Sequence, residues 1–292
     1  MSESVIADFV GNFNTSLVQR AEPAKGRILL SQKRLVLAAD GSDEGKMTIP
    51  LSQIFDVAVG QVPPDLGNFF DSTVTIAFNK NSTRHVTAIE TGDEKIEKFS
   101  TVLFKALLNG TAMTIKHPAR LGGRVTGEQF NPAKLFLKPR AVKFKSADST
   151  VVIDLSTVTD FDKKQREIAG STREVLAIRH MQNGQSAMSL SACDESRKMN
   201  LLGRYLRLEY SEIVDDLRDI EFSEQETELL VAVYSTGDGV SLSAVLDIDA
   251  SQVTMMVTEL EEKGLLTSTD SGTELTPKGR IVVSDKLEDV NA

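Results

Sequence analysis

The chain has 292 residues, a formal net charge of −9 at pH 7 and a single cysteine, Cys193. One cysteine excludes an internal disulfide, and no apolar run approaches the roughly eighteen residues that a membrane helix needs. The first four residues, Met1-Ser2-Glu3-Ser4, have neither the basic nor the apolar region of a signal peptide, so we expect a cytoplasmic protein with no direct membrane insertion.

The second third of the chain repeats the plan of the first. Three segments recur in the same order, residues 23–25, 34–37 and 49–56 in the first copy and residues 132–134, 140–143 and 153–160 in the second. The number of residues that separates matching segments of the two copies changes only slightly along the chain. Such a change is expected when loops differ in length and strands do not. An order of segments that recurs in this way indicates a duplicated structural unit.

Strands and one closing helix are expected in each copy. Alternating apolar and polar runs predict strands at residues 73–78 and 84–90, and again at 174–179 and 186–192. A long amphipathic segment ends each copy, residues 93–109 and 194–217. The pattern predicts an α+β fold that begins with a tandem pair of pleckstrin-homology-like β-domains, each closed by a C-terminal helix.

The remaining residues predict a third domain of a different kind. Ser223 and Glu226 form a capping box that opens a first helix. A second short helix is expected at residues 241–246, and Asp249 begins a third. A hairpin tip at residues 270–272 and a final helix after Thr276 complete a winged helix-turn-helix pattern. We therefore expect three domains, 1–111, 112–220 and 221–292.

The charge of this third domain argues against DNA binding. From Ser223 onward there are 14 acidic and four basic residues, whereas the preceding residues hold 28 acidic and 29 basic ones. Affinity for DNA comes largely from Lys and Arg side chains that neutralise phosphates. The expected wing, Thr267–Thr273, contains neither. The third helix carries Met255, Glu259 and Glu262 outside its apolar face, which is formed by Val253, Met256, Val257 and Leu260. We predict protein docking through Met255, Glu259 and Glu262, with no nucleic acid as a partner.

No sequence motif indicates chemistry. The three histidines, His85, His117 and His180, lie far apart and in no ligand spacing. Residues 41–47 resemble a phosphate loop, but the segment is one residue short. It also lies between two expected strands, so we predict a hairpin turn there. The pair Gly122 and Gly123 indicates a bend that joins the two repeats. We expect no enzyme, no cofactor and no metal.

The helix at residues 194–217 carries three stripes of side chains. Leu202, Leu206, Tyr210, Ile213 and Leu217 form an apolar stripe that should cover the helix's own sheet. A basic stripe contains Arg197, Asn200, Arg204 and Arg207, and a third, apolar stripe contains Leu201, Tyr205 and Leu208. Either the third stripe packs on the neighbouring domain and the arginines are solvated, or one of these two stripes receives a partner. Arg197, Arg204, Arg207 and Tyr205 are therefore candidate partner-binding residues.

Five ungapped segments resemble archaeal CheF, the adaptor family between the chemotaxis system and the archaellum motor. They are residues 26–38 (GRILLSQKRLVLA), 49–60 (IPLSQIFDVAVG), 116–125 (KHPARLGGRV), 197–211 (RKMNLLGRYLRLEYS) and 251–265 (SQVTMMVTELEEKGL). The resemblance implies a non-enzymatic scaffold. Its expected partners are the phosphorylated response regulator CheY, CheD, CheC-type proteins and archaellum subunits of the ArlCDE group.

The expected fold is also compatible with a second function. A transcriptional regulator would use the winged helix on DNA and the repeats as a sensor or dimerisation region. It requires basic side chains on the third helix and the wing, which the sequence lacks.

Overall fold

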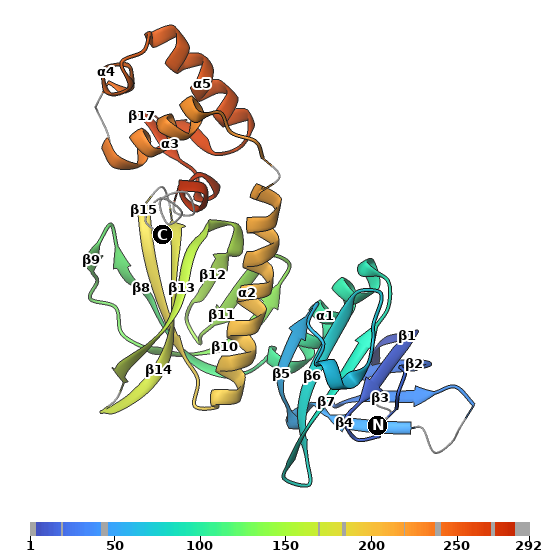
Figure 1. The fold of residues 1–292 in the computed structure, drawn as a ribbon. Helices are drawn as coiled ribbons and strands as arrows, with labels where there is room; N and C mark the ends of the chain where they lie inside the picture. The colour runs from blue at the N-terminus through green and yellow to red at the C-terminus, as the bar shows by residue number, and fades with distance from the viewer. Residues whose placement is uncertain are drawn as a thin grey trace.

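The computed structural model shows a mixed α+β protein, mostly sheet, with two large antiparallel sheets and several helices (Figure 1). Two sheet-and-helix units follow one another along the chain, and a smaller helical unit follows them. The structure describes residues 4–18, 20–41, 46–168, 170–182, 185–218, 220–236, 241–269 and 272–283.

The first unit is a seven-stranded sheet followed by one helix. Its strands are β1 (Val5–Thr15), β2 (Ala24–Ser31), β3 (Arg34–Ala39), β4 (Lys46–Pro50), β5 (Ile54–Val59), β6 (Thr73–Lys80) and β7 (Thr83–Glu90). Single turns of 3-10 helix precede and follow β5, at Leu51–Gln53 and Pro64–Leu66. Helix α1 (Asp93–Leu108) buries apolar residues at helical spacing, among them Ile96, Phe99 and Leu103.

The second unit has the same elements and one additional short strand. Its strands are β8 (Ala112–Leu121), β9 (Arg124–Val125), β10 (Asn131–Lys138), β11 (Ala141–Lys145), β12 (Thr150–Asp154), β13 (Val158–Ile168), β14 (Ser171–Gln182) and β15 (Gln185–Ala192). A single 3-10 turn, Leu155–Thr157, again lies before the fifth strand of the plan, and α2 (Ser196–Arg218) closes the unit.

The two sheets have the same strand order. The first runs β4-β3-β2-β1-β7-β6-β5 and the second runs β12-β11-β10-β8-β15-β14-β13, with β9 paired to β8. The repeat seen in the sequence is therefore a repeat of topology. Alternation of buried and exposed residues places the apolar side chains of each strand on the core face, as for Ile28 and Leu30 in β2.

One expectation about the junction is wrong. Gly122 and Gly123 do not join the repeats; they form the turn between β8 and β9, where both adopt a positive φ that favours glycine. The chain instead passes between the units at residues 109–111, directly after α1. The hairpin predicted at residues 41–47 connects β3 and β4, although residues 42–45 lie outside the described part.

The third unit has three helices, a hairpin and a further helical segment. Its elements are α3 (Glu224–Thr236), α4 (Leu242–Leu246), α5 (Ala250–Glu262), β16 (Leu266–Thr269) and β17 (Gly272–Leu275), and residues 277–283 are helical. The predicted capping box is present: Ser223 N donates to Glu226 Oε2 at 2.8 Å, and Glu226 N donates to Ser223 Oγ at 3.1 Å. The tip of the predicted hairpin includes residues 270 and 271, which lie outside the described residues.

Candidate protein-binding surfaces

Helix α2 covers its own sheet with one apolar face. Leu202 is buried on this face. The ring of Tyr210 lies 5.6 Å from the ring of Phe161 in β13, and its hydroxyl donates to Thr159 O at 3.4 Å. The stripe predicted to cover the sheet therefore does so at these positions. The side chain of Ile213 lies outside the described residues.

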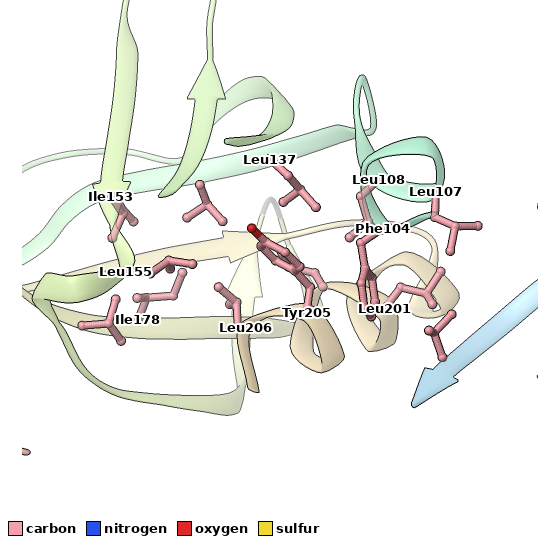
Figure 2. Packing of buried hydrophobic residues seen from close by; sticks show 14 of the residues in the cluster. Phe104, Leu107, Leu108, Leu137, Ile153, Leu155, Ile178, Leu201, Tyr205 and Leu206 are labelled. Atoms are coloured by element: carbon pink, nitrogen blue, oxygen red, sulfur yellow. The ribbon is translucent and has the colours of Figure 1, made fainter. Parts of the chain in front are cut away.

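A second face of α2 packs against the first unit. Leu201 and Tyr205 are at most 1% exposed. The ring of Tyr205 lies 5.5 Å from the ring of Phe104 in α1, and its hydroxyl donates to Lys138 O at 3.3 Å. Figure 2 shows Tyr205 pointing into a group of buried side chains contributed by both units. The candidate partner-binding residue Tyr205 is thus a core residue between the repeats, because α1 of the first unit already covers its face.

Two of the three candidate arginines also meet the first unit. Arg204 donates from Nε to Asp56 Oδ1 at 2.9 Å and from Nη2 to Oδ2 at 3.0 Å, and this bonding raises the pKa of Arg204. Arg197 donates from Nη1 to the backbone oxygens of Leu51 and Ile54, at 3.1 and 2.7 Å. The basic stripe therefore fixes α2 to β5 and the turn before it. Asp56 lies 148 positions before Arg204, so spacing within the helix carries no sign of this pair.

The same junction leaves a cleft of about 470 Å³ between the units. Arg207, the third candidate arginine, lies on this cleft and is exposed. The cleft is lined by Phe55, Asp56, Arg84, Lys163, Asn200, Gly203, Arg204 and Arg207. Arg84 lies in β7 and Lys163 in β13, so only the packing of the two units brings them to the same cleft as α2.

The candidate residues of the third unit lie on the surface of α5. Met255 is 58% exposed, and Glu259 and Glu262 are exposed beside it on the helix. A different face of α5 is buried at Met256 and Leu260, as the spacing predicts.

The basic residue that follows α5 is held within the chain. Lys263 donates from Nζ to Glu226 Oε1 at 2.6 Å and to Glu221 O at 3.1 Å, and Nζ lies 5.6 Å from the centre of the Phe222 ring. Glu226 is 5% exposed, so this ammonium neutralises a buried carboxylate. The surface of α5 is therefore acidic, since its neighbouring cation points inward.

The structure brings together two histidines that the sequence separates. His117 and His180 stack with ring centres 5.6 Å apart, and Ser189 Oγ lies between them, 2.7 Å from His117 Nδ1 and 3.0 Å from His180 Nε2. His180 and Ser189 are buried. Burial lowers the pKa of both imidazoles, and the neighbouring His117 lowers that of His180 further. Strand register across β8, β15 and β14 makes this cluster, and spacing along the chain carries no sign of it.

Among the described residues, no group of three His, Cys, Asp or Glu side chains is arranged to hold a metal ion. No helix in this part of the chain combines the length and the hydrophobicity that a bilayer crossing requires.

Comparison with known proteins identifies the family. A family model described as Archaeal Chemotaxis signal transduction system protein F matches residues 5–212, and a model described as a domain of unknown function matches residues 221–288. The chain thus belongs to the archaeal CheF family, whose role lies in archaeal chemotaxis signalling. It is 46% identical to Taxis protein CheF2 of Halobacterium salinarum over the full length of both chains, and 30% identical to Taxis protein CheF1 of the same organism over 99% of both.

Proposed function

We propose that this protein is a non-enzymatic adaptor that carries the chemotaxis signal to the archaellum motor. Its partners on the signalling side are phosphorylated CheY, CheD and CheC-type proteins, and those on the motor side are ArlCDE-type archaellum subunits. The observation that carries the proposal is the likeness to the CheF family along the whole chain, including 46% identity to Taxis protein CheF2. A cytoplasmic location follows from these partners.

The fold supports an adaptor built from docking modules. We assign the two sheet-and-helix units to pleckstrin-homology-like repeats, since both share one strand order and end in a helix. We assign the third unit to a winged helix-turn-helix, since α3, α4 and α5 precede a two-stranded hairpin. Bonds from α2 to the first unit, such as Arg204 to Asp56, hold the repeats together as one platform.

The third unit docks a protein through the exposed acidic face of α5 in this proposal. Met255 supplies a flexible apolar contact, and Glu259 and Glu262 complement a basic partner. The DNA-binding alternative is disfavoured because the face that would enter a groove is acidic and Lys263 already pairs with Glu226. A gel shift on genomic fragments at low salt tests that alternative directly.

Calorimetry with CheY tests the adaptor function. An adaptor that reads phosphorylation needs a different affinity for the two states of its partner. We expect CheY activated with beryllofluoride to bind several-fold more tightly than CheY without it. Equal affinities for both forms would contradict the switching role.

A further inference from the structure

The cleft between the two repeats carries more positive charge than the chain neutralises. Four of its lining residues are cationic, and Asp56 is the one carboxylate among them. Both carboxylate oxygens of Asp56 already accept a hydrogen bond from Arg204. Lys163 has its own partners, Asn200 Oδ1 at 2.7 Å and Glu174 Oε1 at 3.2 Å. Two of the four cations, Arg204 and Lys163, therefore already have partners within the chain.

The other two cations, Arg84 and Arg207, come from different repeats. Arg84 lies over the ring of Phe55 with its guanidinium carbon 5.6 Å from the ring centre, and Arg207 lies on α2. Within the described part of the chain, neither guanidinium pairs with a carboxylate. Cations that share a cleft repel each other and attract an anion, and the protein walls concentrate that field. The cleft is thus prepared for a negatively charged ligand.

Gly203 gives an independent sign of a ligand. This glycine lies inside α2 on the cleft, where glycine weakens a helix relative to alanine. Its neighbours do not require it: an added Cβ would meet Lys163 Cε at 3.7 Å, an ordinary contact. The missing side chain instead leaves the helix backbone accessible from the cleft.

The chemistry of the lining favours a protein segment over a small molecule. Pockets for small ligands are mostly apolar with a few polar groups, whereas Phe55 is the one apolar side chain among these lining residues. Clusters of arginine are one recurring means by which proteins recognise acidic or phosphorylated segments of other proteins.

We propose that this cleft binds an acidic segment of a protein partner, with Arg84 and Arg207 each receiving a carboxylate and Gly203 admitting the segment's backbone. This inference rests on the proposed adaptor function, because it takes the ligand to be part of a protein. Because Arg84 and Arg207 belong to different repeats, a bound segment contacts both repeats at once. The site is separate from the acidic face of α5, so the protein has docking surfaces of both charges.

The test uses the full chain and a fluorescent synthetic peptide in which Glu and Asp alternate with Gly and Ser. We expect saturable binding of this peptide that weakens as the salt concentration rises. A control peptide with Gln in place of Glu and Asn in place of Asp should not bind. The double variant Arg84→Gln/Arg207→Gln should weaken binding about tenfold, since each exposed ion pair contributes modestly. The matched control Arg120→Gln/Arg124→Gln removes the same charge from exposed arginines of β8 and β9 and should bind as the unaltered protein does.

Gly203→Ala separates binding from folding. The variant should melt at a higher temperature because alanine favours the helix, and it should bind the peptide more weakly because a methyl group enters the cleft. Equal peptide affinity in the unaltered protein, Arg84→Gln/Arg207→Gln and Gly203→Ala would overturn the site. The adaptor function would still be tested separately, by calorimetry with CheY, so failure of this site and failure of the adaptor function can be told apart.

Discussion

Arg204 of α2 and Asp56 of β5 face each other across the junction of the two repeats and share two hydrogen bonds of 2.9 and 3.0 Å. The paired geometry matches the planar guanidinium to the carboxylate and fixes the direction of α2 relative to the first sheet. The two side chains are 41% and 34% exposed, so water screens much of their attraction. The pair therefore orients the repeats more than it stabilises them.

A double-mutant cycle measures this pair. Arg204→Met and Asp56→Asn should each lower the free energy of unfolding by up to about 1 kcal/mol, and the double variant should lose less than the sum. Urea denaturation gives the three values. Arg207→Met is the control on the same helix and should leave stability unchanged. Additive losses would mean that the two side chains do not interact in solution.

The ring of Tyr205 should matter far more to stability than its hydroxyl. Tyr205→Ala leaves a cavity beside Phe104 and should cost about 3–5 kcal/mol, as for other large buried aromatic side chains. Tyr205→Phe keeps the ring and should cost about 1 kcal/mol for the lost hydrogen bond to Lys138 O. Chemical denaturation of both variants checks the order. Comparable losses would show that the ring is not packed between the repeats.

Acid should destabilise the second unit through His117 and His180. Burial lowers the pKa of both groups from the ordinary value of 6.5, so the unfolded chain binds protons more readily than the folded one. Their contribution to stability is present above about pH 6.5 and is lost as the pH falls through the lowered values. Unfolding by urea at a series of pH values should show this slope, and His117→Gln should reduce it. An unchanged slope in His117→Gln would assign the acid sensitivity to other groups.

The capping box of α3 should be a sensitive point of the third unit. Ser223→Ala removes one cap and should cost about 0.5–2 kcal/mol. Glu226→Ala should cost more, because it also leaves Lys263 without its carboxylate. Burial acts to raise the pKa of Glu226, but the bonds from Lys263 and Ser223 outweigh it and the pKa is lowered. This contribution is therefore lost as the pH falls below the carboxyl's usual 4.5, and thermal unfolding monitored by circular dichroism checks both variants.

Reversing the charge of α5 should weaken one class of partner. Glu259→Lys/Glu262→Lys replaces two exposed carboxylates outside the buried face, so the fold should remain intact. Binding of CheY and of the archaellum subunits, measured separately, should fall for one of the two. Glu224→Lys/Glu228→Lys on α3 changes the charge equally and serves as the control. Unchanged binding of every partner, with normal motility, would show that the acidic face of α5 only keeps the protein in solution.

Local pattern was sufficient to predict much of the fold. Alternation located β6, β7, β14 and β15, and helical spacing located α1 and α2 to within about two residues. The first strand of each unit was not predicted from these patterns. Val5–Thr15 carries Asn and Gly among its apolar residues, which obscures its alternation. In Ala112–Leu121 the apolar residues do alternate, at Met113, Ile115, Ala119 and Leu121, but this strand lies outside the segments that recur between the two copies.

The sequence by itself determined which faces of each element are apolar, that the plan occurs twice, and that Ser223 and Glu226 cap a helix. These properties depend on residues a few positions apart, whose geometry the backbone dictates. Only the tertiary structure decided what covers each face. Tyr205 is buried because α1 lies on it, Arg204 is paired because Asp56 arrives from another sheet, and Arg207 remains open on the cleft. Periodicity reports the polarity of a surface, whereas its partner depends on how whole units pack, which no local spacing encodes.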